Sequence, residues 1–106
     1  MKLMTVAVLA AFAGGSVAAF AADHTISQKG RVFSETELTV KKGENIVFVN
    51  DDNIAHNIMS TTAGNEFNLG SQAPGASSSV ALSKAGEVAV VCAIHPRMKM
   101  TVTVSD

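Results

Sequence analysis

From residue 22 onward, apolar and polar residues alternate with a period of two, and turn residues interrupt this alternation every few positions. Successive side chains of a β-strand point to opposite faces, so the period is typical of strands that bury one face. From residue 22 onward, no stretch shows the convincing 3.6-residue period of an amphipathic helix. The chain is therefore predicted to be all-β, and its short strands with frequent turns favour a Greek-key β-sandwich of seven to eight strands.

Two of the expected strands are strongly apolar. Asn45–Asn50 contains four consecutive apolar residues, which predicts a central strand buried on at least one face. Residues 88–92 are predicted to form a second buried strand. Residues 60–75 are rich in Gly, Ser, Asn and Pro and are expected to form a long irregular connection. The other expected strands cover residues 26–32 with a break near Lys29, 37–40, 54–59, 77–82 and 101–104.

Apolar residues are concentrated at the N-terminus, where they make up 16 of the first 21 residues. Lys2 is the only charge there, an apolar run follows it, and residues 19–21 have the small-residue pattern of a cleavage site. We therefore predict a signal peptide over residues 1–21, cleaved after Ala21, and one domain over residues 22–106. A retained membrane anchor is the alternative, because residues 3–22 are just long enough to span a bilayer, although alanine and glycine make a poor span.

The predicted mature domain is small and weakly charged. Its roughly 85 residues allow one modest core, which excludes a second domain or a large multisubstrate enzyme. Seven Lys and Arg and nine Asp and Glu do not gather into a long run, and this disfavours nucleic acid or an anionic membrane as a partner. The single cysteine, Cys92, excludes an intramolecular disulfide, so another role is expected for it.

The segment that follows the second buried strand carries a thiolate, an imidazole and a thioether, spaced three residues apart at Cys92, His95 and Met98. All three groups bind metal ions of intermediate to soft character. Taken singly, Cys92 would ordinarily be a small core residue, His95 a surface histidine and Met98 a gap-filling core methionine. Together with His56 as a second imidazole, they match the ligand set of blue-copper sites. Zinc is the alternative ion, but a thioether is a poor zinc ligand and a good copper(I) ligand.

These motifs resemble the cupredoxins, the small copper proteins that include plastocyanin, pseudoazurin and amicyanin. The resemblance covers residues 37–104 and rests on LTVKKGE at 38–44, VFVN at 47–50, HN at 56–57 and CxxHxxM at 92–98. It implies a cupredoxin-like domain that binds one copper per chain. His56, Cys92 and His95 would then be the equatorial ligands and Met98 the axial ligand. The resemblance also suggests that Asn57 hydrogen-bonds across to the Cys92 loop.

Met100 competes with Met98 for the axial position, because its spacing from His95 also occurs in the family. In the family pattern, inward valines follow the axial methionine four and six residues later. Val102 and Val104 meet this condition for Met98. Met100 is therefore expected to pack beneath the ligand loop.

Two further residues are candidate copper contacts. Met59 lies three residues after His56 and is near enough in sequence to line the copper pocket, although a core role is favoured. His24 would become the third residue after cleavage. A free N-terminal amine with a histidine in the third position binds copper(II) in square-planar geometry. An ordinary strand histidine is the favoured interpretation of His24.

The resemblance implies an electron carrier rather than an enzyme, because four protein ligands leave no open coordination position for a substrate. We expect an exported, monomeric protein of the periplasm that passes single electrons between redox proteins, and no stable membrane insertion after cleavage. The alternatives are a periplasmic copper-tolerance protein that sequesters or transfers copper, and a structural zinc or metal-free sandwich.

A soluble or membrane-associated redox protein is expected to dock at the His95 end of the domain. His95 would be the solvent-facing ligand, in a small apolar patch suited to brief docking. Arg97 and Lys99 beside it would steer an acidic partner. The expected patch consists of Ala55, Ala93, Ile94 and Pro96.

Overall fold

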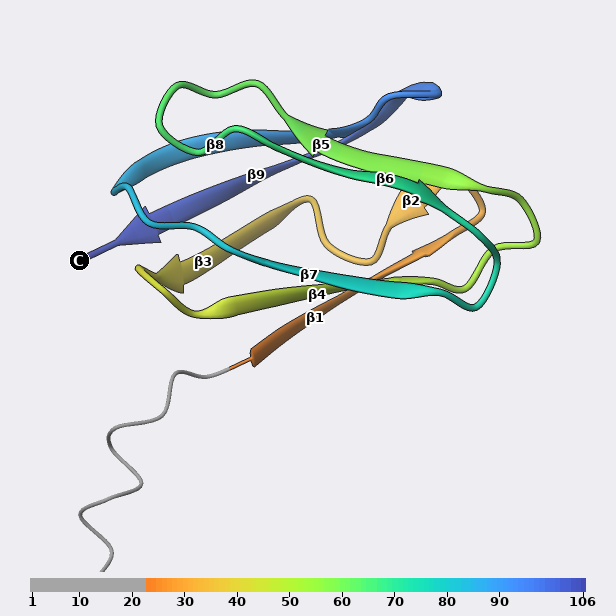
Figure 1. Ribbon diagram of the computed structural model, residues 1–106, viewed down its shortest axis with the longest axis horizontal. Coiled ribbons are helices and arrows are strands. Elements are labelled where there is room, and N and C mark those ends of the chain that lie inside the picture. The colour runs from red at the N-terminus through yellow and green to blue at the C-terminus, as the bar shows by residue number, and fades with distance from the viewer. Residues whose placement is uncertain (1–22) are drawn as a thin grey trace, which may run out of the picture.

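The computed structural model describes residues 23–106, which form nine β-strands (Figure 1). The strands are β1 (Asp23–Lys29), β2 (Val32–Phe33), β3 (Glu37–Lys41), β4 (Asn45–Asn50), β5 (His56–Ser60), β6 (Phe67–Gln72), β7 (Ser77–Ala81), β8 (Gly86–Cys92) and β9 (His95–Ser105). The predicted signal peptide lies outside the described residues. Within residues 23–106, no helix is long and apolar enough to cross a membrane.

The strands form two sheets that pack face to face (Figure 1). One sheet has the strand order β2-β1-β4-β7, and the other has the order β3-β9-β8-β5-β6. β1 is parallel to β4 and β3 is parallel to β9, while the other paired strands are antiparallel. Many neighbouring strands are therefore distant in sequence. The predicted all-β sandwich is confirmed.

The core lies between the two sheets and is built from alternate residues of the strands. On β4, Ile46, Phe48 and Asn50 are fully buried, while the residues between them are partly exposed. β4 lies between β1 and β7, so the prediction of a central strand at this position is confirmed. The inward positions of β8 end at Cys92, which is 1% exposed. The core therefore extends directly to the predicted metal ligands.

The segment 60–75, predicted to be irregular, contains strand β6 over Phe67–Gln72. β6 pairs with β5 at the edge of its sheet, and the register shifts between Asn57 and Met59. An edge strand has one neighbour only, and the Asn, Gly and Ser residues of β6 carry little strand propensity. The composition of this segment therefore did not predict strand β6, which is stabilised by its pairing with β5.

Strand β9 begins at His95, six residues before the strand expected at residues 101–104. In its first half, His95 pairs with Cys92 of β8, and after a register shift the pairing resumes with Met100 opposite Val90. The connection between β8 and β9 is therefore a two-residue turn at 93–94, and Met98 lies on a strand rather than in a loop.

The sandwich has two ends of different character. At the His95 end, the β8–β9 turn lies near the β4–β5 loop and the β1–β2 turn (Figure 1). At the opposite end, which we call the C-terminal end, the β3–β4 turn meets the last residues of β9, and Lys42 N–H donates to Ser105 O at 2.9 Å. Gly43 has a φ of 82° in this turn, a conformation that favours glycine.

Candidate metal centre

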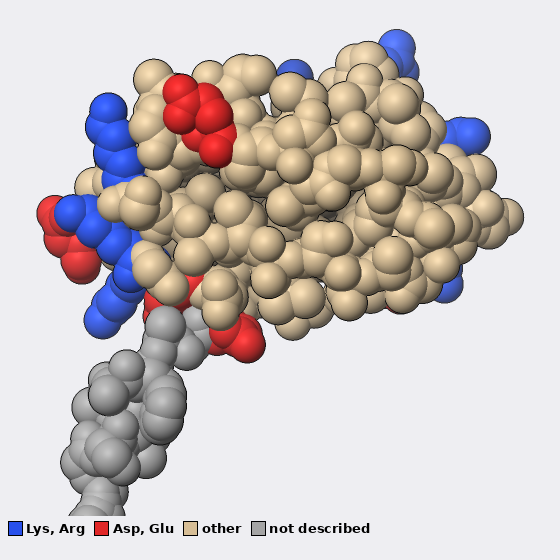
Figure 2. All heavy atoms as spheres, in the orientation of Figure 1, with Lys and Arg blue, Asp and Glu red and all other residues tan. Residues whose placement is uncertain are grey.

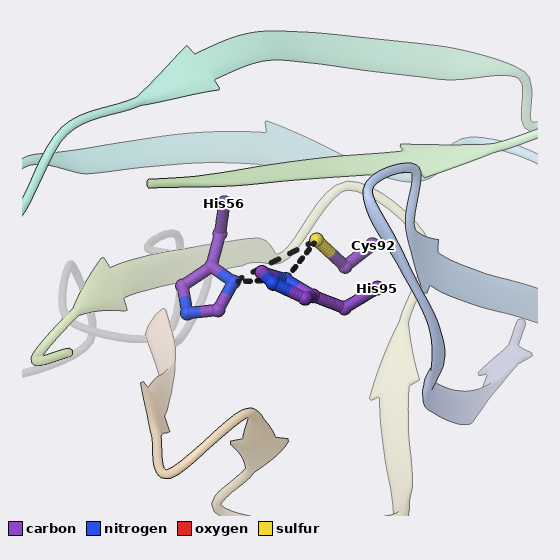
Figure 3. A group of neighbouring side chains, drawn as sticks. All are labelled: His56, Cys92 and His95. Carbon is purple, nitrogen blue, oxygen red and sulfur yellow. Dashed lines mark hydrogen bonds between the residues drawn. The ribbon is translucent and has the colours of Figure 1, made fainter. Parts of the chain in front are cut away.

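The structure brings His56, Cys92 and His95 together at one end of the sandwich (Figure 3). His56 is the first residue of β5, Cys92 the last of β8 and His95 the first of β9. Their ligand atoms all lie within 4.8 Å of one another. His56 and Cys92 are buried, whereas His95 is half-buried. Three residues that the sequence separates by up to 39 positions therefore form one cluster, as predicted.

The three ligand atoms form a triangle that fits one metal ion. His56 Nδ1 lies 3.2 Å from His95 Nδ1, and Cys92 Sγ lies 3.7 Å and 3.6 Å from these two nitrogens. An ion in the centre of a trigonal plane, with bonds of about 2.0 Å to nitrogen and about 2.3 Å to sulfur, would hold its nitrogens about 3.5 Å apart and its sulfur about 3.7 Å from each. The observed triangle is close to this size. The side chains would therefore close around an ion with little movement.

Asp52, in the β4–β5 loop, sets the orientation of the His56 ring. Its Oδ2 atom accepts a hydrogen bond from His56 Nε2 at 2.9 Å. A proton on Nε2 leaves a free lone pair on Nδ1, the atom that faces Cys92 and His95. The carboxylate therefore selects the tautomer of His56 that can bind a metal through Nδ1.

The same carboxylate also holds the β1–β2 turn. Asp52 accepts hydrogen bonds from the main-chain N–H groups of Arg31 and Gly30, both at 3.0 Å. The Arg31 N–H and the His56 side chain are the main causes that lower the pKa of Asp52 to about 2. The sequence analysis did not identify this role of Asp52. Its spacing of four residues from His56 was the available signal.

Buried amide side chains hold the β4–β5 loop in place through hydrogen bonds. The Asn50 Nδ2 group donates to Ile54 O at 2.8 Å and to Gln72 O at 2.9 Å, and Asn50 Oδ1 accepts from Asp52 N–H at 2.9 Å. Gln28 Nε2 donates to Gln72 Oε1 at 3.0 Å. Asn50, Gln72 and Gln28 are all at least 98% buried. Buried amides require hydrogen-bond partners, so this network fixes the loop that carries Asp52.

The contact between Asn57 and the Cys92 loop is present, but the main chain makes it. Asn57 N–H donates to Cys92 Sγ at 3.3 Å, and Ala93 N–H donates to Asn57 O at 2.8 Å. The side-chain amide of Asn57 instead donates to Asn68 Oδ1 at 2.8 Å. A hydrogen bond from the main chain to the sulfur is one of the features that tune a metal–thiolate bond, and side-chain substitution at position 57 would leave it in place.

Met98 and Met100 both point into the sandwich, at different depths. They are 2% and 3% exposed. On β9, Met100 lies opposite Val90, one inward position deeper than Cys92 on β8. Met98 is one inward position closer to the ligand cluster, because side chains of a strand alternate between its two faces. The register therefore favours Met98 over Met100 as the fourth ligand.

The structure does not bring Met59 or His24 to the cluster. The alternation on β5 turns His56 inward and the partly exposed Met59 to the outer face. His24 lies on β1 opposite Ile46 of β4, and its Nε2 atom is 2.9 Å from Glu44 Oε1. The free amine expected at residue 22 lies outside the described residues, so the square-planar site at His24 stays a prediction.

Comparison with known proteins agrees with this geometry. The family described as copper binding proteins, plastocyanin/azurin family, matches residues 20–105 of this chain. No curated protein sequence matches. A purple cupredoxin from Nitrosopumilus maritimus is 25% identical, with a TM-score of 0.69 over 78% of this chain and 100% of that chain.

Two further solved structures share the fold. An amicyanin variant in its reduced Cu(I) form is 20% identical, with a TM-score of 0.72 over 78% of this chain and 82% of that chain. A Cu-containing nitrite reductase from Thermus scotoductus SA-01 is 23% identical, with a TM-score of 0.73 over 79% of this chain. This chain spans only 22% of that enzyme's chain.

The donor set agrees with the family. Two imidazoles and a thiolate in a trigonal arrangement, with a buried methionine one inward position away, are typical of a type 1 copper site. The cofactor is copper. The chain therefore belongs to the plastocyanin/azurin family of copper-binding proteins, the cupredoxins.

Proposed function

We propose that this cupredoxin is an exported carrier of single electrons. Its copper would be held by His56, Cys92 and His95, with Met98 as the weak axial ligand. When bound, copper supplies a reversible one-electron couple between its Cu(II) and Cu(I) states. The observation that carries the proposal is the triangle of Nδ1, Nδ1 and Sγ atoms, with edges of 3.2, 3.6 and 3.7 Å, which already has the size of a trigonal metal site.

The surrounding residues support fast transfer because they keep the ligands in place. Asp52 and the buried amides behind it fix the His56 ring, and the Asn57 N–H group holds Cys92 Sγ. Ligands that do not move between oxidation states keep the reorganisation energy low, which an electron carrier needs. With four protein ligands, no position remains for a substrate, and this favours a carrier over an enzyme.

His95 is the proposed port for the electron. It is half-buried and lines a surface hollow together with Ile94 and Pro96. We propose that a soluble or membrane-associated redox protein docks here briefly, that the carrier is a monomer and that it works in the periplasm. The pattern of residues 1–21 supports export.

The test is to load the chain starting at Ala22 with copper and to follow its visible spectrum through repeated reduction and oxidation. An intense thiolate-to-copper band that disappears and returns, together with rapid electron self-exchange, would support the proposal. A colourless protein that binds zinc tightly would contradict it. Slow self-exchange, combined with strong induction of expression by excess copper, would favour the copper-tolerance function instead.

A further inference from the structure

Two large apolar side chains are exposed among residues 23–106, and both line the same hollow. Val32 is 59% exposed and Ile94 is 54% exposed. The hollow has a volume of about 560 Å³ and lies at the His95 end. Its lining residues are Arg31, Val32, Ile94, His95, Pro96, Arg97 and Met98. The β1–β2 turn therefore forms one wall, and the β8–β9 turn with the start of β9 forms the other.

The two arginines of the chain, Arg31 and Arg97, lie on opposite walls of this hollow. No carboxylate is among its lining residues. The nearby Asp52 directs its oxygens to the β1–β2 turn and to His56. The large Asp and Glu groups visible in Figure 2 lie toward the C-terminal end, whereas only Lys and Arg stand out at the opposite end. The hollow therefore has an apolar residue and an arginine on each wall and no carboxylate in its lining.

The wall formed by the β1–β2 turn is held in an unusual conformation. Arg31 has a φ of 59°, the only positive φ of a non-glycine residue among residues 23–106. Residues with a side chain seldom adopt this conformation, and it persists where the surroundings impose it. Here Asp52 imposes it through hydrogen bonds to the N–H groups of Gly30 and Arg31. The positions of Arg31 and Val32 are thus set before any partner arrives.

We propose that these two walls form a docking groove for a redox protein that presents an apolar contact surface bordered by carboxylates. The proposal rests on the proposed electron-carrier function and names the kind of partner that this site accepts. Arg31 and Arg97 would pair with carboxylates on either side, while Val32 and Ile94 contact the apolar centre. Lys99 does not line this groove; it lines a neighbouring hollow, which Arg97 also lines.

A protein fits this groove better than a small anion does. Pockets for small molecules are concave and enclose most of the ligand surface. Here the most prominent apolar side chains, Val32 and Ile94, are more than half exposed. An apolar patch with a charged rim is the usual composition of a protein interface.

The test measures electron transfer from the copper-loaded, reduced protein to two ferric c-type cytochromes, one acidic and one basic. One electron leaves the reduced protein and converts the ferric haem to the ferrous state, and no proton or group is transferred. The variants are Arg31→Gln, Arg97→Gln and Val32→Ser. Lys41→Gln, which removes one exposed charge at the C-terminal end, is the matched control.

With the acidic cytochrome at low ionic strength, each arginine variant should lower the second-order rate constant by about fivefold, and high salt should remove the difference. Lys41→Gln should leave the rate unchanged. Val32→Ser should lower the rate at every ionic strength, because it removes apolar contact. Arg31→Gly provides a second variant that suits the positive φ, so a loss of rate in it reflects the missing charge rather than misfolding.

The proposal would be overturned if Arg31→Gln and Arg31→Gly behaved like Lys41→Gln, or if the basic cytochrome reacted faster than the acidic one. The proposal would also be overturned if Val32→Ser and the parent protein transferred electrons to both cytochromes with equal rate constants. The hollow would then be interpreted as a site for small anions. Failure of the electron-carrier function is distinct, because the parent protein would then show no reversible colour change and reduce neither cytochrome.

Discussion

The two ends of the sandwich hold a carboxylate in different ways. At the His95 end, Asp52 is 11% exposed and accepts three hydrogen bonds, from His56 and from two main-chain N–H groups. At the C-terminal end, Asp106 is 83% exposed and pairs with Lys42 at 2.6 Å. Both carboxyl groups have lowered pKa values, but Asp106 owes this to the Lys42 side chain alone. A carboxylate held by directed hydrogen bonds can orient a ligand, whereas an exposed ion pair is screened by solvent.

The largest expected effect comes from Cys92→Ser at the His95 end. The substitution removes the thiolate, so the intense visible band should be lost entirely and copper binding should weaken strongly. Absorption spectra and a competition titration with a copper chelator would measure both. The fold should remain, which circular dichroism of the copper-free protein would check. A variant that kept the intense band would show that Cys92 is not the ligand.

Asn50→Ala tests whether the buried amides stabilise the His95 end. It leaves the Asp52 N–H group and two carbonyl groups without their partner, so the free energy of unfolding should fall by about 3 kcal/mol. Asn45→Ala is the matched control, because Asn45 lies exposed at the other end of the same strand. It should change the free energy by about 0.5 kcal/mol or less. Equal values for the two variants in denaturant unfolding would contradict the contrast between the ends.

Asp52→Asn tests the orientation of His56 directly. The amide weakens the hydrogen bond that selects the Nε2–H tautomer, and loss of such a partner lowers metal affinity by about 10- to 100-fold. A competition titration with a copper chelator would measure it. Asp106→Asn, the same chemical change at the C-terminal end, should leave the affinity unaltered. If both variants bound copper like the parent protein, Asp52 would have no part in holding the ligand.

The two methionines of β9 test how far the influence of the site extends into the sandwich. Met98→Leu should keep the intense band and raise the reduction potential, because a weak sulfur ligand is lost. Met100→Leu should change the potential little, since Met100 lies one inward position deeper. Voltammetry of the two variants side by side measures the difference. Loss of copper in Met100→Leu alone would reverse the assignment of the axial ligand.

The smallest effect is expected from the Lys42–Asp106 pair. Lys42 lowers the pKa of Asp106 below its usual 3.8, so any stabilisation by the pair is present above this pH and lost as the pH falls below it. Because both groups are exposed, Lys42→Gln should have no measurable effect on unfolding in physiological salt. Denaturant unfolding at pH 7 and pH 3 would check this. A clear loss of stability at pH 7 would show that the C-terminal end also depends on its charges.

Much of this molecule could be predicted from residues close in sequence. The period of two predicted strands and their buried faces, as for Val102 and Val104 on β9, and the apolar run at residues 45–50 predicted the central strand β4. The spacing from Cys92 to Met98 predicted three of the four ligands, since the end of β8, one turn and the start of β9 carry these three residues. Both results depend on local rules, because alternation and spacing need no knowledge of the partner strand.

The features that were missed depend on contacts between distant segments. β6 became a strand through its pairing with β5, and β9 starts early because His95, Lys99 and Met100 pair with β8. The role of Asp52 requires that the β1–β2 turn and His56 lie on either side of it. Arg31 and Val32 join the groove only because the β1–β2 turn faces Ile94. Among these contacts, only the one between Asp52 and His56 has a local signal in the sequence, their spacing of four residues.

The placement of Met98 on a strand limits how this segment can change in evolution and in design. Met98 and the inward residues that follow it are alternate residues of β9. The pairing of Met100 with Val90 fixes which face of the strand they occupy. Between His95 and Lys99 the pairing with β8 shifts register, and residues 96–98 have no register partner on β8. An insertion in this stretch would therefore change the position of Met98 relative to His95, while the residues from Lys99 onward could stay paired. Substitutions leave the number of residues between these two ligands unchanged, whereas a change of length acts on their relative position directly.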